Sequence, residues 1–271
     1  MNSKKIKIIA EIGWNHMGDL DLAAKMIQSA SENGADICKF QTWSEKNLKS
    51  GQWDSDGRRD VYKKAQLSQE DHYYLKKKCD ENNVKFLTSI FNIKDLNFLV
   101  QLNSDMIKIP SHEIYNQKLI SSCIENFNLT LISTGASKHK EIQSLKNNLD
   151  LSKSVFMHCV SSYPCPAEKV NLPRLEYMKN FTENIGYSGH FHGIDDSIAA
   201  ICAGATYIEK HFTVDNNLDG RDNKFALLPE DLNNLSAFRD NYTKMIIDKG
   251  VDLQESEMDT FNNYRGRWSN D

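Results

Sequence analysis

Short apolar segments recur along the chain at intervals of about thirty residues, and a segment with helical periodicity follows most of them. Each is a run of apolar and small residues, which is typical of parallel strands that are covered on both faces. The predicted strands span residues 7–13, 36–43, 85–91, 105–110, 129–135, 154–160, 184–190 and 206–213. The predicted helices span residues 20–32, 68–82, 94–101, 116–126, 138–147, 173–181 and 229–247. One further helix is expected between the last two strands.

Eight strand–helix alternations favour a closed barrel, because an open doubly wound sheet usually has fewer strands. The predicted fold is therefore α/β, a (β/α)8 TIM barrel in a single catalytic domain over residues 1–248. Residues 249–271 are polar and form a predicted C-terminal tail or linker. Residues 44–67 show no clear period and are predicted to be a long polar loop.

Composition narrows the class of protein. The net charge of −4 leaves no basic field of the kind that binds nucleic acid. The six cysteines include no CxxC pair, and Cys38, Cys123, Cys159 and Cys202 lie in apolar segments, as buried free thiols do. Neither a disulfide framework nor a zinc knuckle is expected. The sequence has no predicted signal peptide or membrane span, which favours the cytoplasm.

Two histidines occupy matching positions on the last two predicted strands. His190 ends the first of them, and His211 lies near the end of the second. A crossover helix between these strands makes them parallel neighbours, so both imidazoles emerge at the same end of the sheet. Such a pair can hold one divalent metal ion or a substrate. The alternative is that each histidine is a structural residue whose hydrogen bonds are satisfied within the protein.

Charged residues in other predicted strands point to the same end of the barrel, where catalytic residues of this fold gather. Lys39 and Lys108 interrupt apolar strands, and a buried charge is costly unless it is paired or used. With nearby hydroxyl groups, two lysines can cradle a phosphate or carboxylate. Alternatively, each forms a buried ion pair with Glu11 or Glu209. Glu11 and Glu113 are either general bases or partners that neutralise the lysines.

These parts suit carbon–carbon bond formation between an enol phosphate and a metal-polarised aldehyde. Several motifs carry a specific resemblance, in this order along the chain: AEIGWNHMGD, CKFQT, KIPSHE, STGAS, HCVSSYP, IGYSGH and IEKHFT. They resemble the sialic acid synthase (N-acetylneuraminate synthase) family. Its members are transferases that condense phosphoenolpyruvate with a hexosamine-type aldose to give a nonulosonic acid, a 2-keto-3-deoxy acid, and phosphate. The family's fold is also a (β/α)8 barrel.

The resemblance implies a role for particular residues. The metal ligands fall on His190 and His211, with manganese as the expected ion and magnesium or cobalt as alternatives. The residues expected to bind phosphoenolpyruvate are Lys39, Thr88, Lys108, Ser111, Ser161 and Ser188. The residues expected to contact the sugar are Asn15, Tyr163 and Asp222. Glu11 and Glu113 are the expected catalytic carboxylates. One of them takes the proton of the water that adds to C2 after C3 has attacked the aldehyde.

Three departures from the family pattern stand out. The motif YSGH replaces the usual YSDH, so Gly189 removes a carboxylate beside a predicted metal ligand. Residues 44–67 look shorter than the family's loop, which leaves the acceptor open between N-acetylmannosamine and related amino sugars. The family's C-terminal antifreeze-like domain does not follow the linker-like RGRWSND. A homodimer, or a separate partner that supplies this domain, is therefore expected beside the two small-molecule substrates.

Two other functions remain open from the sequence. A Schiff-base pyruvate aldolase would use Lys39 or Lys108 as its nucleophile, because desolvated lysines in barrels perform that chemistry. A non-catalytic barrel that binds phosphoenolpyruvate or a sugar would agree with the absent domain and with Gly189.

Overall fold

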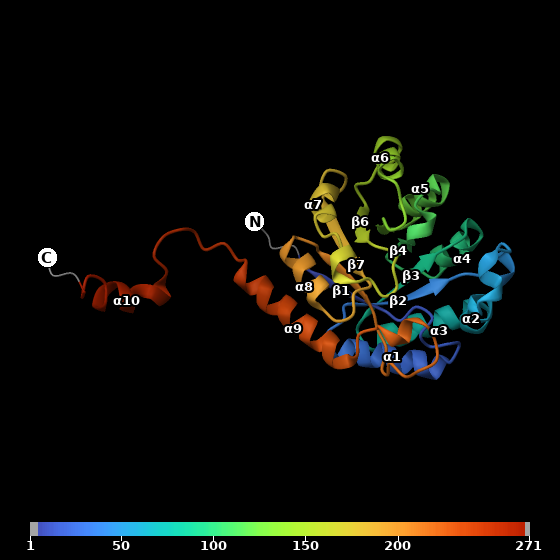
Figure 1. The fold of residues 1–271 in the computed structure, drawn as a ribbon, viewed down its shortest axis with the longest axis horizontal. Coiled ribbons are helices and arrows are strands. Elements are labelled where there is room, and N and C mark those ends of the chain that lie inside the picture. Colours follow the sequence, from blue (N-terminus) through green and yellow to red (C-terminus); the bar gives the residue numbers. More distant parts are fainter. Residues whose placement is uncertain (1–4, 269–271) are drawn as a thin grey trace.

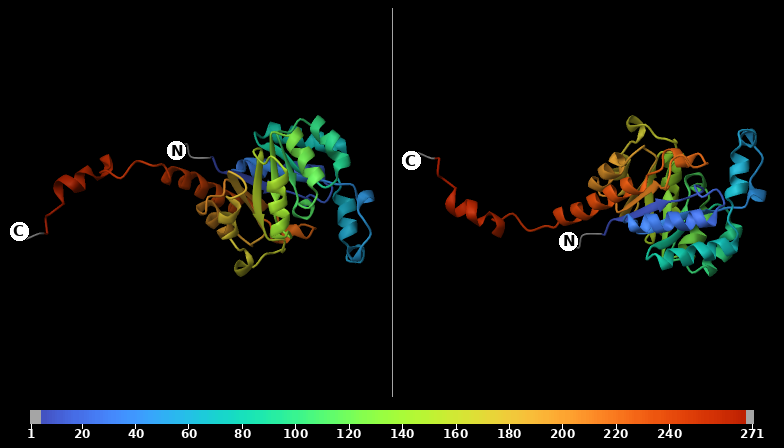
Figure 2. Two further views of the ribbon diagram at one scale, coloured as in Figure 1. Left: turned by 90° about the horizontal axis from the view of Figure 1, so that it is seen from above. Right: turned by 90° about the horizontal axis from the view of Figure 1, so that it is seen from below.

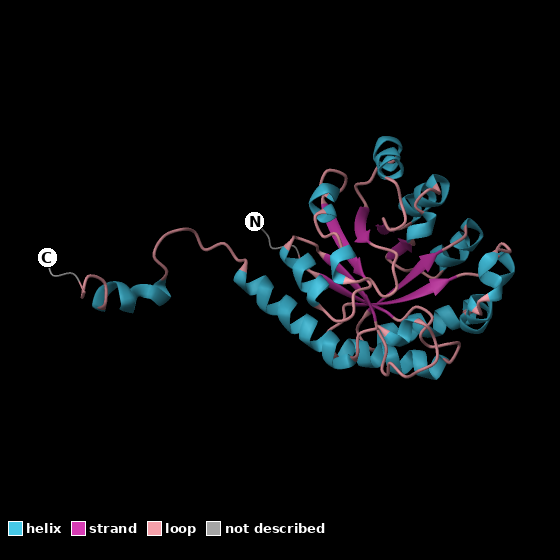
Figure 3. Cartoon of the chain, viewed as in Figure 1, coloured by secondary structure: helices cyan, strands magenta, loops and turns pink. Residues whose placement is uncertain are grey.

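Eight parallel strands close into a barrel, in which consecutive strands pair and β1 pairs with β8. The computed structural model describes residues 5–268. Figure 3 shows the strands at the centre and the helices around them. The strands are β1 (Lys7–Glu11), β2 (Ile37–Thr42), β3 (Lys85–Ile90), β4 (Met106–Ile109), β5 (Leu129–Ser133), β6 (Ser154–Cys159), β7 (Asn184–Gly189) and β8 (Tyr207–His211). The predicted α/β barrel is confirmed.

Helices surround the strands in Figure 1 and follow most of them in sequence. They are α1 (Leu20–Glu32), α2 (Arg58–Ala65), α3 (Gln69–Glu81), α4 (Leu96–Gln101), α5 (Gln117–Asn126), α6 (His139–Asn148), α7 (Arg174–Met178), α8 (Asp195–Cys202), α9 (Pro229–Met245) and α10 (Met258–Asn263). The long helix α9 contacts both α8 and α1, so it closes the outer ring between the last and the first repeat.

Side chains that cap the first turn set where helices begin. The Ser68 hydroxyl accepts a hydrogen bond from the Asp71 amide, and the Asp71 carboxylate accepts one from the Ser68 amide. This capping box starts α3. Asp19 caps α1 in the same way by accepting from the Leu22 amide. These residues satisfy amide groups that a helix leaves without partners, which is why such boundaries can be predicted from sequence.

Alternation along the strands divides the buried apolar residues into two sets. The larger set lies between the strands and the helices. The smaller set fills the barrel interior and consists of Ile9, Ile37, Leu87, Leu131, Val155 and Met157. The next interior position on a strand comes two residues later, toward its carboxyl end. Glu11, Lys39 and Ser89 occupy such positions, so a polar mouth lies above an apolar base.

The prediction that residues 44–67 form an irregular loop was wrong in part, because α2 and two short 3-10 turns lie within them. Tyr62 on α2 packs edge-on against Trp14 and Trp43, with ring centroids 5.2 Å apart in both pairs. The Trp43 indole also donates a hydrogen bond of 3.1 Å to the Tyr62 carbonyl. Aromatic contacts with residues distant in sequence therefore hold a helix whose own sequence, RRDVYKKA, is mostly charged.

The cysteines follow the prediction with one exception. All six are free. Cys202 was expected to be buried but is exposed at the last turn of α8, where the helix face turns toward solvent, and the other five are buried.

Beyond α9 the chain leaves the barrel, and Figures 1 and 2 show α10 well away from it in every view. All described residues from 244 to 268 are exposed except Gln254, which is half-buried. They nevertheless include large apolar side chains such as Ile247, Val251 and Trp268. The last residues of the predicted tail, 269–271, lie outside the described residues. Within residues 5–268, no helix is both long enough and apolar enough to cross a membrane.

The separation of tail and barrel predicts how a shortened chain behaves. Deleting residues 249–271 should change the free energy of unfolding by less than about 0.5 kcal/mol, since the deleted side chains pack on little else. Leu131→Ala, in the barrel interior, should cost about 2–5 kcal/mol because it leaves a cavity. Urea unfolding of both variants beside the full chain measures the two effects. A large loss on deletion would show that the tail belongs to the folded domain.

Candidate active site

Four buried charges lie together at the carboxyl ends of the strands. The Lys39 ammonium lies 2.7 Å from Glu11 Oε2, and the Lys108 ammonium lies 2.7 Å from Glu209 Oε2. A longer contact of 3.8 Å joins Lys39 to Glu209 Oε1, so the two pairs form one cluster. Each of the four residues is at most 5% exposed. Two positive and two negative charges therefore balance within the barrel, which keeps their burial tolerable.

Polar neighbours complete the hydrogen bonding of this cluster. Lys39 donates to the Ser89 hydroxyl at 3.1 Å, and the Ser188 hydroxyl donates to Glu209 Oε1 at 2.9 Å. The Gln41 amide donates to Glu11 Oε1. These contacts hold both carboxylates in place, and both lysines are buried beside them.

The two carboxylates ionise at very different pH. Burial, the largest influence, raises the pKa of Glu11 to about 7 although Lys39 lies beside it. Burial also opposes the charge of Glu209, but Lys108 and Lys39 outweigh it and hold the pKa of Glu209 at about 2. Glu209 is therefore a permanent counter-ion, whereas Glu11 can take up and release a proton near neutral pH.

Ser111 and Ser161 approach each other at Gly135, just beyond β5. The Ser111 hydroxyl accepts a hydrogen bond of 3.2 Å from the Gly135 amide and lies 3.6 Å from the Cys159 sulfur. A Cβ atom at position 135 would lie 2.4 Å from the Ser161 hydroxyl and 2.7 Å from that of Ser111. A side chain at position 135 would displace these hydroxyls, so glycine lets both of them lie close to its backbone amide. Donors in such an arrangement suit an anion.

His190 and His211 lie side by side at the same end of the barrel, with ring centroids 5.5 Å apart. His190 Nδ1 donates to the Val160 carbonyl at 2.9 Å. Burial opposes the charge of His190, but Cys159 outweighs it and raises the pKa of His190. His211 Nδ1 lies 3.5 Å from Asp222 Oδ2. Burial, followed by repulsion from His190, lowers the pKa of His211 well below its usual range. His211 is therefore the neutral imidazole of the pair, and a neutral imidazole is the form that binds metal ions.

The donor set fits a divalent metal ion held by two imidazoles. His211 Nδ1 is buried and has no hydrogen-bond partner, as expected of a nitrogen kept for another ligand. Within residues 5–268, no group of three or more His, Cys, Asp or Glu side chains is arranged to hold a metal ion. The two imidazoles are therefore the donors that the described residues offer to such an ion.

The residues predicted to contact a sugar surround these histidines. The Tyr163 ring lies 4.0 Å from the His190 ring and is half-exposed. Burial raises the pKa of Asp222 to about 6. Asn15 is buried, its amide donates to the Phe212 carbonyl at 2.9 Å, and its own side-chain oxygen has no partner. Tyr163 and Asp222 thus lie beside the histidines, and Asn15 contacts the residue that follows His211.

Two predicted residues lie apart from the charged cluster. The Thr88 hydroxyl is 2.7 Å from that of Thr42, which also contacts His72 on α3, so Thr88 points to the helical side of the strand. Alternation puts Ser89, its neighbour, inside the barrel instead. Glu113, on the 3-10 turn after β4, accepts a hydrogen bond of 3.1 Å from Asn116. No contact recorded for the described residues joins Glu113 to the cluster.

Other residues join the site without a role predicted from the sequence. Glu209, Gln41 and Ser89 stood out only as polar residues at strand ends, with Glu209 also weighed as a partner of a lysine, and Cys159 was predicted to be a buried thiol. The alternation of side chains along each strand could have identified these residues. Each of them lies on the same side of its strand as a residue of the interior apolar set or of the charged cluster.

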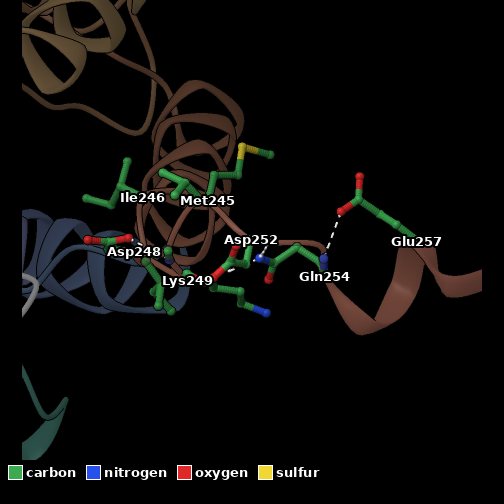
Figure 4. A pocket seen from close by; sticks show the side chains of 10 residues that line it. Met245, Ile246, Asp248, Lys249, Asp252, Gln254 and Glu257 are labelled. Carbon is green, nitrogen blue, oxygen red and sulfur yellow. Dashed lines mark hydrogen bonds between the residues drawn. The ribbon is translucent and has the colours of Figure 1, made fainter. Parts of the chain in front are cut away.

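An opening of about 310 Å³ lies beside the histidines and is lined by Tyr163, Pro164, His192, Arg221, Lys224 and Phe225. A larger hollow of about 570 Å³ lies at the end of α9 and is shown in Figure 4. Its wall includes Met245 and Ile246, which are largely exposed, and the Gln254 amide bonded to Glu257 at 2.9 Å. This hollow belongs to the tail and is far from the barrel chemistry, so the smaller opening is the relevant one.

Comparisons with known proteins agree with this geometry. N,N'-diacetyllegionaminic acid synthase of Campylobacter jejuni is 35% identical over 246 residues, which cover 84% of this chain and 74% of that protein. N-acetylneuraminate-9-phosphate synthase of Drosophila melanogaster is 32% identical over 255 residues, covering 88% and 68%.

Among solved structures, a sialic acid synthetase of Leptospira borgpetersenii superimposes with a TM-score of 0.86 at 30% identity, covering 98% of this chain and 94% of that one. The profile of the NeuB family matches residues 26–250. The chain therefore belongs to the NeuB family, whose named relatives here are acid synthases.

Proposed function

We propose that this chain is a transferase that condenses phosphoenolpyruvate with an amino-sugar aldose to form a nonulosonic acid and phosphate. The observation that carries the proposal is the buried cluster of Lys39, Lys108, Glu11 and Glu209 beside the paired histidines. It offers cationic groups for an enol phosphate next to a site for an aldehyde. The names of the family relatives, synthases of sialic acid type, support the same reaction class.

Phosphoenolpyruvate binds across the lysines in this proposal. Lys39 and Lys108 face its negative charges as point cations, and Ser188 bridges from β7. Ser111 and Ser161, gathered at the Gly135 amide, bind the remaining anionic oxygens.

Glu11 is the proposed general base. C3 of phosphoenolpyruvate forms a bond to the aldehyde carbon, and water then adds to the cation left at C2. Glu11 takes the water's proton, a role that suits a carboxylate with a pKa near 7. The hemiketal phosphate finally collapses to the 2-keto acid and inorganic phosphate. Glu113, on the turn that carries Ser111, is the alternative acceptor of this proton.

His190 and His211 hold the metal ion, manganese foremost, with magnesium or cobalt as alternatives. A divalent ion supplies Lewis-acid polarisation of the aldehyde oxygen. The chain's part is to orient the imidazoles, and the Val160 carbonyl does so by fixing the His190 tautomer. The acceptor enters through the opening lined by Tyr163 and Phe225, where Asn15 and Asp222 offer polar contacts.

The proposed partners rest on exposed apolar side chains, and the proposed compartment rests on the free cysteines. The exposed apolar side chains of residues 245–268 suit contact with a second copy of the chain, or with a separate partner that carries an antifreeze-like domain. The cytoplasm is the proposed compartment, since free thiols persist in a reducing environment.

A Schiff-base aldolase is the second candidate, since burial lowers the pKa of Lys108 and thereby favours a neutral amine. The ion pair with Glu209 opposes this chemistry by stabilising the charged form.

The proposed metal site predicts that activity depends on a divalent metal ion. Phosphate release from phosphoenolpyruvate with a panel of N-acetylated hexoses should require manganese, stop with EDTA and return on adding the ion. His190→Ala with His211→Ala should lower the rate by more than about 100-fold. His139→Gln, on the barrel surface, should leave it unchanged. Product masses identify the acceptor. Undiminished turnover in the double variant would sink the proposal.

Glu11 predicts the pH dependence. Its ionised form is required, so kcat/KM for phosphoenolpyruvate should be fully present above pH 7 and fall as the pH drops through about 7. Asp222→Asn removes the group with a pKa of about 6 and should leave that limb in place. If the acidic fall in kcat/KM shifts in Asp222→Asn but persists in Glu11→Gln, Glu11 is not the general base.

Borohydride trapping separates the two candidate reactions. With pyruvate and borohydride, a Schiff-base enzyme gains the mass of a reduced pyruvyl adduct on lysine, whereas the ion-paired Lys108 should gain none. Intact-mass spectrometry measures this, with Lys108→Met as the matched control. An adduct that disappears in Lys108→Met would favour the aldolase.

A further inference from the structure

A second group of buried charges lies behind the histidine pair, on the helical side of β7 and β8. The Lys210 ammonium contacts both oxygens of Asp196, at 3.1 and 3.0 Å, and donates to the Phe191 carbonyl at 2.7 Å. The Tyr187 hydroxyl donates to Asp196 Oδ2 at 2.9 Å. Asp196 lies in the first turn of α8. None of these residues faces the proposed substrates.

This group is sealed from solvent. Tyr187, Asp196 and Lys210 are 2%, 6% and 3% exposed. Removing one partner of a buried ion pair leaves the other charge without compensation, so Asp196 and Lys210 depend strongly on each other. The cost of burying such a pair calls for a role beyond the stability of the fold.

The connections of Lys210 indicate that role. It precedes His211 on β8, and the carbonyl that it binds belongs to Phe191, which follows His190. Lys210 is also the register partner of Gly189, which precedes His190. Lys210, which is adjacent to His211 in sequence, is thus hydrogen-bonded to Phe191, which is adjacent to His190. Lys210 and Asp196, here called the clamp, therefore lie between the two segments that carry the histidines.

Gly189 explains why the clamp takes its carboxylate from a helix. A Cβ atom at position 189 would lie 2.3 Å from Asp196 Oδ2 and 2.5 Å from the Tyr187 ring. The Asp196 carboxylate therefore occupies the space that a side chain at position 189 would fill.

We propose that Asp196 is a positioning residue for the His190–His211 pair, with a carboxylate supplied by α8 in place of one at position 189. The role in metal binding rests on the proposed function. The structural part does not rest on it. Carboxylates at both positions 189 and 196 would overlap, and a chain with a carboxylate at neither position would leave Lys210 without its ion-pair partner. One carboxylate is therefore needed at one of these two positions.

A carboxylate exchange tests the structural part. Gly189→Asp alone should lower the thermal unfolding midpoint through overlap, and Asp196→Ala alone should lower it through the unpaired Lys210. The double variant, Gly189→Asp with Asp196→Ala, should recover most of the loss once the Tyr187 ring turns aside. A double variant no more stable than the worse single variant would overturn the exchange.

Positioning is read from the histidines themselves. Imidazole ¹⁵N–¹H spectra without added metal should show shifted His190 and His211 signals in Asp196→Asn. Asp195→Asn, the adjacent and exposed carboxylate on the same helical turn, should leave them unchanged. Equal spectra in the two variants would overturn the positioning role, whether or not the protein binds metal.

Manganese titration then links the clamp to function. Asp196→Asn should weaken Mn²⁺ binding by about 10- to 100-fold, the usual effect of losing a group that orients a metal ligand. Asp195→Asn should bind like the unaltered chain, and the exchanged double variant should regain affinity. If the unaltered chain binds no Mn²⁺, the metal part of the proposed function fails, while the spectra and the unfolding midpoints still decide the role of Asp196.

Discussion

The arrangement of this molecule depends on the alternation of side chains along eight parallel strands that close into a barrel. Inside the ring, every second side chain points to the axis, and the interior positions run from an apolar base to a charged mouth. Each interior charge has its partner on another strand. Glu11, Lys39, Lys108 and Glu209 pair across four strands, and the barrel cannot close without bringing them together.

The same alternation separates two groups of charged residues that are close in sequence. Glu209 and His211 face the mouth, while Lys210 between them faces α8. The inner charges are those of the proposed binding site, where burial raises the pKa of Glu11 to about 7 and both lysines are ion-paired. The outer charges are fully satisfied by Asp196, Tyr187 and a backbone carbonyl. The inner layer carries the proposed chemistry, and the outer layer carries the proposed positioning role of Asp196.

Sequence patterns predicted the fold well because their signals are local. Continuous apolar strands, helix caps such as Ser68 with Asp71, and regular spacing do not depend on distant contacts. The same reasoning failed for α2, whose charged sequence is held by Trp14 and Trp43 from elsewhere in the chain. Propensity and period carry no information about such partners.

The sequence by itself determined the order of strands and helices, the barrel they form, and the placing of Lys39, Lys108, His190 and His211 at one end of it. Only the tertiary structure decided that Ser89 rather than Thr88 joins Lys39, and that Asp196 fills the space above Gly189. The reason is physical: direction along a strand follows from the chain, but which face a residue takes and which carboxylate meets which lysine depend on register between segments far apart in sequence.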